Sequence, residues 1–202
     1  YKSLYAGVTT LRLVGEDHGL DFPLIAAIDK GEAIGPRIRT AGEVISQTGG
    51  HGSLFGDGPY QLAHLARAQI AEGATWVKIA VSGGIATQGT AIEAAPFTDD
   101  EVKVLIEAAH RMGAKVTAHN GSSTAALQAM KYGIDGFEHG YHLNEAVLKE
   151  MKEKGVWYCP TIVVSQNGAF DFFKRIGSPA WYLDRVRSTG KAHWATLQNA
   201  IK

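Results

Sequence analysis

The chain has 202 residues, which is enough for one domain with a sizeable hydrophobic core. Its 20 Lys and Arg residues balance 20 Asp and Glu residues, so no overall charge recruits nucleic acid or an anionic membrane. No apolar run approaches the roughly 18 residues that a membrane-spanning helix needs. The single cysteine, Cys159, excludes an internal disulfide and favours the reducing cytoplasm. A mature chain that had lost its leader would also fit, so a secreted parent protein stays open.

Short β-branched runs alternate with amphipathic stretches along nearly the whole sequence. The runs predict strands at residues 8–14, 37–41, 76–81, 115–119, 136–139 and 156–160. The amphipathic stretches predict helices at residues 22–31, 60–72, 98–113, 122–132, 145–154 and 181–202. Gly190 is expected to break the last helix. Residues 42–58 and 165–180 are expected to be irregular.

Capping residues mark several of these helix boundaries. Asp21 is expected to cap the first helix, and Thr98 with Glu101 forms the capping-box pattern that opens another. Asn144 is expected to cap the helix at residues 145–154, and Gly155 to end it.

The alternation of strands with helical crossovers predicts an α/β domain with a parallel sheet. A doubly wound sheet and a (β/α)8 barrel of the TIM type both satisfy this order. Two observations favour the barrel: no strand-to-helix turn carries a glycine-rich phosphate loop, and polar residues sit at the carboxyl ends of several different strands. Six strand–helix units are two fewer than a barrel has, so we expect an incomplete barrel over residues 1–202.

Lys78, His119 and His139 are the residues whose pattern indicates chemistry. Lys78 lies within an apolar strand; taken alone, a lysine that extends its ammonium to the rim is the simpler interpretation. A buried lysine, however, must lose its charge or find a partner. His119 and His139 end consecutive strands. One strand-end histidine is usually structural, whereas two on neighbouring parallel strands can converge, and neutral imidazole is a common ligand of zinc.

The motifs around these residues, in their order and spacing, resemble those of the amidohydrolase superfamily. The motifs are Trp76-Val77-Lys78-Ile79, Ser82-Gly83-Gly84, Thr117-Ala118-His119, Glu138-His139-Gly140, Ala6-Gly7-Val8-Thr9-Thr10-Leu11-Arg12 and Thr48-Gly49-Gly50-His51-Gly52. Within the superfamily, the prolidase-like and dipeptidase-like members related to imidazolonepropionase are the most similar. The resemblance runs along the whole chain and implies that it covers about strands 2 to 7 of the barrel.

The resemblance implies a binuclear centre, with two zinc ions as the expected cofactor. Lys78, carboxylated on its amine, would bridge the two metals, and His119 and His139 would bind the more exposed one. A hydroxide bridging the metals would attack the carbonyl carbon of an amide or peptide bond. Lys78, His119 and His139 are therefore the expected metal-binding and catalytic residues.

Two parts of the family's site have no counterpart in this sequence. Relatives carry His-x-His on strand one and an aspartate on strand eight, and both positions would lie outside residues 1–202. We therefore expect the chain to be a central fragment that is inactive by itself and retains metal weakly. Its open strand edges should favour self-association, so a homo-oligomer is a possible state.

Further candidates lie near the expected mouth of the barrel. His51 sits in a glycine-flanked loop, where substrate contact and simple loop flexibility are equally good explanations. Tyr141 and His142 follow a strand at a position where relatives contact the substrate, and His142 looks better placed. Cys159 is interpreted as a small buried residue and not as a nucleophile. The remaining histidines are expected to be solvated: His18, His64, His110 and His193.

The leading hypothesis is a metal-dependent hydrolase of a small peptide-like substrate, either a dipeptide or an N-acyl amino acid. A cyclic-amide hydrolase of the imidazolonepropionase type is a close alternative, as is another amidohydrolase reaction such as deamination or phosphotriester hydrolysis. The distant alternative is a non-catalytic barrel piece whose histidines only close hydrogen bonds, or a domain that binds a ligand without turnover.

Overall fold

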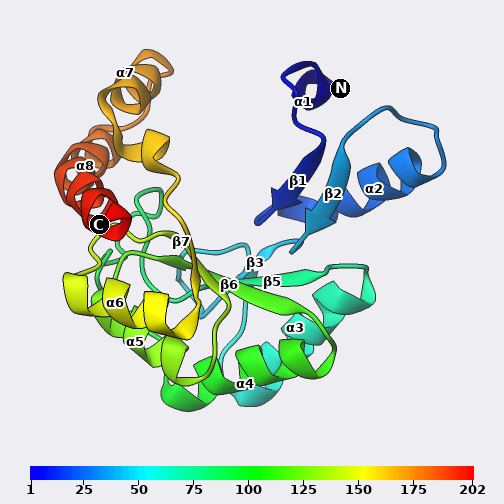
Figure 1. The fold of residues 1–202 in the computed structure, drawn as a ribbon, viewed down its shortest axis with the longest axis horizontal. Helices are drawn as coiled ribbons and strands as arrows, with labels where there is room; N and C mark the ends of the chain where they lie inside the picture. Colours follow the sequence, from blue (N-terminus) through cyan, green and yellow to red (C-terminus); the bar gives the residue numbers. More distant parts are fainter.

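All strand pairings are parallel in the computed structural model, which describes all 202 residues (Figure 1). Strand β1 (Thr10–Leu13) pairs with β2 (Arg37–Thr40) in a two-stranded sheet. A six-stranded sheet has the order β4-β3-β5-β6-β7-β8. Its strands are β3 (Val44–Ser46), β4 (Leu54–Phe55), β5 (Trp76–Ala80), β6 (Lys115–Asn120), β7 (Gly136–His139) and β8 (Trp157–Cys159).

The segment from β2 to β3 joins the two sheets into one curved wall. Its first half pairs with β1 and its second half pairs with β5. Between them the Thr75 N–H donates to the Thr40 carbonyl oxygen at 2.9 Å, so the contact with the β5 side begins before β3 does. Gly42 makes the bend, with a left-handed φ of +63°. Apart from β4, which pairs at the edge beside β3, the strands follow one another in barrel order, which confirms the predicted α/β fold with a partial barrel.

The helices return along the outside of this wall. Those between strands are α2 (Asp21–Asp29), α3 (Pro59–Ala71), α4 (Asp99–Arg111), α5 (Ser123–Lys131) and α6 (Glu145–Lys154). The predicted capping box of Thr98 and Glu101 is present at α4, and the Asn144 side chain accepts from the Val147 N–H at α6. Gly155 ends α6 in the left-handed conformation, as expected.

The hydrophobic core lies between the outer face of the wall and these helices. Side chains alternate across each strand, so one set from β5, β6 and β7 packs outward against α3, α4 and α5. The outward set is fully or almost fully buried and comprises Val77, Ile79, Val116, Ala118 and Phe137. The inward set includes the buried polar residues Lys78, Thr117, His119 and Glu138 and faces the space that a barrel encloses.

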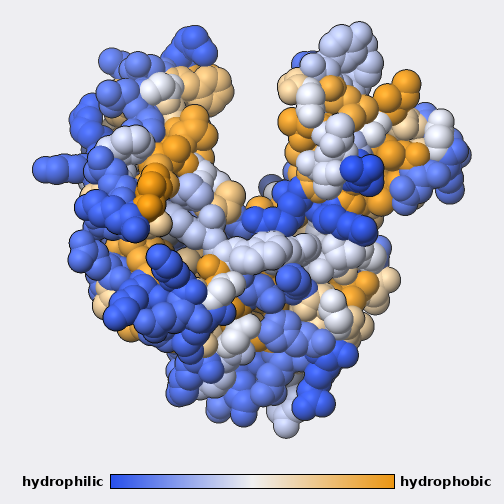
Figure 2. All heavy atoms as spheres, viewed as in Figure 1, coloured by the Kyte–Doolittle hydropathy of each residue, from blue (hydrophilic) through white to orange (hydrophobic).

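Two arms rise from the inner face of the wall (Figure 1). One arm holds β1, β2, α2 and the short N-terminal helix α1 (Lys2–Tyr5) with the single turn η1 (Asp17–Gly19). The other holds α7 (Asn167–Arg175) and α8 (Ala180–Ile201), preceded by the 3-10 turn η2 (Ile162–Ser165). Figure 2 shows an open notch between the arms, with apolar side chains on both of its sides.

An ion pair across the inner face ties β1 to β7. The Arg12 guanidinium lies 2.8 Å from the carboxylate of Glu138, which is 2% exposed. Arg12 also lies over the Trp76 ring, 4.8 Å from its centroid, and Thr117 donates to Glu138 at 2.7 Å. Because the carboxylate is buried, losing its partner would leave a costly unpaired charge. The pair therefore fixes the curvature of the wall at its N-terminal arm.

The structure corrects four predictions about local elements. Asp21 does not cap α2; it is buried and accepts a hydrogen bond from the Thr40 hydroxyl. Residues 42–58 contain β3 and β4, and residues 165–180 contain α7. Helix α8 continues through Gly190 without a break. None of the helices combines the length and apolar character that crossing a membrane requires.

Close packing explains why Gly190 lies inside a helix. A Cβ at this position would meet the Ser165 carbonyl oxygen at 2.4 Å, which no real side chain tolerates. The glycine therefore lets α8 approach η2 and does not interrupt the helix.

We predict that Gly190→Ala lowers the free energy of unfolding by about 1–3 kcal/mol, because the new methyl group must push α8 away from η2. Gly168→Ala in α7 is the matched control, since nothing lies within 4 Å of its added Cβ. The control should be neutral or stabilising by up to about 1 kcal/mol, as is usual for glycine to alanine in a helix. Urea denaturation measures both, and equal stabilisation by the two variants would contradict the packing argument.

Candidate active site

Parallel register brings the predicted site residues to one end of the wall. Lys78 lies opposite Thr117, Ala80 opposite His119, and Asn120 opposite His139. The imidazole rings of His119 and His139 are 4.7 Å apart between centroids. Lys78 lies two residues before Ala80 on the same inner face, and after burial, the main cause, its charge helps to lower the pKa of both histidines. The structure thus gathers all three predicted residues into one site.

Backbone geometry at the end of β7 turns His139 inward. Strand alternation would send Glu138 and His139 to opposite faces. His139 instead has a φ of +69°, which is rare for a residue with a side chain, and Gly140 follows with +62°. Both Glu138 and His139 therefore face the interior. Such a backbone conformation persists only where surrounding contacts hold it, and Thr161 bonds to the His139 Nδ1 atom.

His119 has one ring nitrogen satisfied and one free. Its Nε2 lies 3.0 Å from the Gly83 carbonyl oxygen. A carbonyl only accepts, so Nε2 carries the proton and Nδ1 keeps its lone pair. This Nδ1 is buried and has no hydrogen-bond partner. Burial, followed by the neighbouring charge of His139, holds the pKa of His119 well below its usual range, so the ring is neutral.

His51 joins the cluster from the loop after β3. Its ring centroid is 4.1 Å from that of His119, and its Nδ1 lies 2.6 Å from the Thr87 hydroxyl. Burial is the main cause that lowers the pKa of His51 to about 4. The ring rests on Gly84, where a Cβ would lie 2.4 Å from the imidazole. Of the two explanations for His51, a defined position in the site fits the structure better than a free loop.

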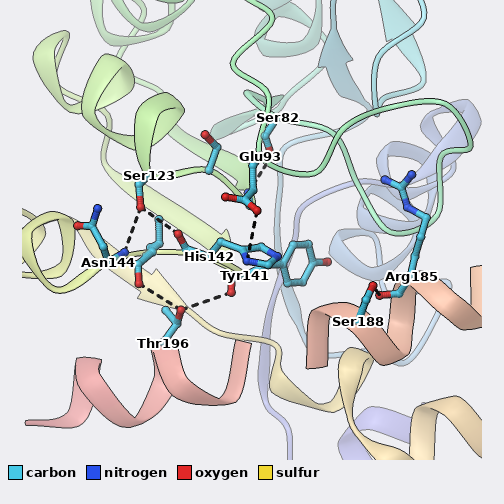
Figure 3. Close-up of polar contacts among 12 residues, drawn as sticks. Ser82, Glu93, Ser123, Tyr141, His142, Asn144, Arg185, Ser188 and Thr196 are labelled. Atoms are coloured by element: carbon cyan, nitrogen blue, oxygen red, sulfur yellow. Dashed lines mark hydrogen bonds and ion pairs between the residues drawn. The ribbon is translucent and has the colours of Figure 1, made fainter. Parts of the chain in front are cut away.

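Tyr141 extends the row of rings away from the wall. Its ring stacks on His139 with 5.2 Å between centroids and 10° between planes. Burial raises the pKa of the Tyr141 phenol, which therefore stays protonated. His142 points elsewhere, with its Nδ1 3.6 Å from the carboxylate of Glu93 (Figure 3). Tyr141, and not His142, is the residue of this pair that contacts the histidine cluster.

His193 was expected to be solvated, and that prediction is wrong. It is completely buried on α8, and its Nδ1 lies 2.7 Å from the Ser165 hydroxyl. Its ring stands perpendicular to Tyr141 with 5.0 Å between centroids. His18, His64 and His110 are exposed as predicted, and His110 also pairs with Asp135 at 2.8 Å.

Lys78 and Cys159 lie deeper on the inner face. Lys78 is 4% exposed, and burial lowers the pKa of its amine to about 8, although the nearby Glu138 carboxylate opposes this. Glu138 itself is held by Arg12 and Thr117. Burial and Glu138 raise the pKa of the half-buried Cys159, so it stays a thiol and fits the expectation that it is no nucleophile.

Sequence reasoning missed Glu138 and Arg185. The Nη2 of Arg185 on α8 donates to the Gly84 and Thr90 carbonyl oxygens, both at 2.7 Å. Figure 3 shows this side chain reaching from α8 toward the loop after β5. No local pattern could have identified Arg185, because its partners lie about a hundred residues away. Glu138 could have been found as a charged residue at an inward position of a buried strand.

The donor set fits a divalent metal in part. Two neutral histidines, one with a buried free Nδ1, are the ligands that zinc-like ions prefer. No three His, Cys, Asp or Glu side chains of this chain lie where they could hold an ion together. A complete cage would therefore need a donor of another kind, for which Lys78 is the nearest candidate, or donors from outside these residues.

Comparison with known proteins identifies the family. The amidohydrolase family model matches residues 2–172. The chain belongs to the amidohydrolase family. It is 27% identical to ochratoxinase of Aspergillus niger over 100% of the chain and 47% of that enzyme. The solved ochratoxinase structure superposes with a TM-score of 0.85, at 27% identity, and covers 99% of this chain and 51% of that one.

Two solved peptidase structures are also similar. A prolidase complexed with N-methylphosphonate-L-proline has a TM-score of 0.91 and 28% identity, and the match covers 98% of this chain and 53% of that one. An Xaa-Pro dipeptidase with methionine bound in its active site has a TM-score of 0.89 and 28% identity, over 97% and 52%. This amidohydrolase chain thus spans about half the length of these relatives, which agrees with a partial barrel.

We predict that Lys78→Met stabilises the metal-free protein at pH 7 by on the order of 2 kcal/mol, because the buried amine has a folded pKa of about 8 against a usual value of about 10.4. Between these values the unfolded wild type binds more protons than the folded one, so its stability rises with pH. The advantage of Lys78→Met should therefore shrink from pH 8 to pH 10. Urea denaturation with a chelator measures it, and the half-exposed Lys103→Met is the control. An advantage that is constant with pH would contradict the lowered pKa of Lys78.

Proposed function

We propose that the protein containing this chain is a divalent-metal hydrolase of amide bonds in small peptide-like substrates. The observation that carries the proposal is the meeting of Lys78, His119 and His139 at neighbouring strand ends, with a buried His119 Nδ1 that no protein group satisfies. A buried polar atom without a partner is costly and is expected where a ligand completes the site. Membership of the amidohydrolase family supports the same reading.

In this proposal Lys78, His119 and His139 hold the ions. The lowered pKa of Lys78 increases the fraction of neutral, nucleophilic amine, which can add carbon dioxide with loss of a proton, and the resulting carbamate offers two hard oxygen ligands. The Gly83 carbonyl orients the His119 ring and leaves its Nδ1 for coordination. Lewis acidity toward a carbonyl group and acidification of water are the chemistry that such ions supply when bound.

The remaining site residues act on the substrate side. Tyr141 keeps its proton, so its phenol can donate to a carbonyl or carboxylate oxygen of the substrate. His51 is neutral and held by Thr87, which leaves its other nitrogen available for a substrate group. The side chains from α7 and α8 that adjoin Tyr141 are largely apolar and can exclude water from the site.

The substrate class rests on the relatives. A prolidase, an Xaa-Pro dipeptidase and ochratoxinase are among the proteins most similar to this chain. We therefore propose a dipeptide or an N-acyl amino acid as the substrate.

Metal analysis tests the proposed centre. The full-length protein should contain about two divalent ions per barrel, and mass spectrometry under native conditions should find Lys78 with one added carbon dioxide. Lys78→Ala should lose most of the metal, whereas the exposed Lys103→Ala should keep it. Metal content that Lys78→Ala leaves unchanged would refute a bridging role for Lys78.

A substrate screen tests the reaction class separately. We expect the metal-loaded protein to hydrolyse members of a library of dipeptides and N-acyl amino acids, with loss of activity on chelation and recovery when metal returns. Cyclic amides and phosphotriesters serve as comparison substrates. Turnover confined to cyclic amides would replace the proposed substrate class by the alternative one.

A further inference from the structure

The loop between β5 and α4, residues 81–98, contacts two histidines of the site, His119 and His51. Its Gly83 carbonyl accepts from His119 Nε2 at 3.0 Å, and its Thr87 hydroxyl bonds to His51 Nδ1 at 2.6 Å. The Gly84 backbone lies directly under the His51 ring. Any movement of this loop would therefore change the orientation of two imidazoles at once.

Both ends of the loop are anchored to neighbouring elements: the Val81 N–H donates to the His119 carbonyl oxygen at 3.1 Å, and the Gln128 side chain donates to the Phe97 carbonyl oxygen at 3.0 Å. The Gly83 N–H donates to the Ala91 carbonyl oxygen at 3.2 Å, which closes its base. Ser82 accepts from the Gly121 N–H at 2.8 Å, next to the end of β6. Beyond these contacts the loop extends toward α8, where a single charged side chain meets its backbone.

Arg185 makes that contact from the other arm of the molecule. Its Nη2 donates to the carbonyl oxygens of Gly84 and Thr90, on the two sides of the loop, at 2.7 Å each. Both are charge-assisted hydrogen bonds, which are stronger than neutral ones. The next residue, Val186, is completely buried, so α8 holds the arginine in place. Arg185 forms no ion pair with any carboxylate, and its hydrogen bonds go to this loop.

We propose that Arg185 is a positioning residue for His119 and His51. By holding the Gly84 and Thr90 carbonyls, it fixes the loop so that Gly83 sets the tautomer of His119 and Thr87 holds the His51 ring in place. The catalytic meaning of this role rests on the proposed function, because it matters only if His119 binds metal. The contact itself can be tested without metal or substrate.

Hydrogen–deuterium exchange of the metal-free, full-length protein is the first test. Loss of two charge-assisted bonds in Arg185→Met should speed amide exchange in peptides from the loop about tenfold or more. Exchange in β6 and α4 should not change. Arg187→Met is the matched control on the same helix, because Arg187 is exposed and lies only near Asp184 and over Phe170. Unchanged loop exchange, or equally faster exchange throughout the chain, would overturn the proposal.

Zinc affinity, measured by competition with a chelator, is the second test. A group that orients a metal-binding histidine is typically worth about tenfold to a hundredfold in affinity, so Arg185→Met should bind zinc at least about tenfold more weakly. Arg185→Lys, which can still donate to a carbonyl, should recover part of this loss, and Arg187→Met should match the wild type. If the wild type and the Arg185→Met variant bind zinc with equal affinity, the positioning role of Arg185 is overturned.

The two tests separate this proposal from the proposed function. If the wild-type protein binds no zinc, the proposed metal centre is refuted. Faster exchange confined to the loop of Arg185→Met would still support the positioning of this loop by Arg185. If zinc binds normally and Arg185→Met does not change amide exchange in the loop, the metal centre stands and the positioning role of Arg185 is refuted.

Discussion

The parallel register of β5, β6 and β7 is the constraint on which the site depends. Registered residues on parallel strands point the same way, so the pairing of Ala80 with His119 and of His119 with Glu138 decides which side chains share the inner face. A slip of one residue would move His119 into the hydrophobic core and Ala118 into the site. The buried outward residues prevent that slip, because apolar side chains fill the outer layer completely. Core packing and site geometry are therefore two results of one alternation.

The same alternation explains how much could be predicted from sequence. Strands and helices of regular period were found because their signals are local: Thr98 and Glu101 lie three residues apart, and the apolar residues of β5 form one short continuous run interrupted only by Lys78. The convergence of Lys78, His119 and His139 could also be predicted, since carboxyl ends of parallel strands meet at one edge. What the strand pattern could not show was that His139 needs a left-handed backbone to join its neighbours.

Interactions between distant segments were beyond the reach of sequence patterns. His193 lies in an amphipathic helix, where a polar residue is usually solvated, but it is buried against Ser165 and Tyr141. Gly190 was expected to break the helix because glycine disfavours helices. Its packing role was not visible in the sequence, because the neighbouring Ser165 carbonyl is twenty-five positions away. The short strands β3 and β4 carry too few residues for any period to be visible among glycines.

Helix α8 crosses the carboxyl ends of the strands and contacts three separate loops there. Along its 22 residues, Arg185 meets the loop after β5, Gly190 and His193 meet η2, and Thr196 donates to the Tyr141 and Leu143 carbonyls after β7. These contact residues lie on one side of the helix, in which each residue turns by about 100°. A shift by one residue would misalign all of them together. The single helix α8 therefore fixes the positions of the three loops relative to one another, so a movement of α8 would move all three loops together.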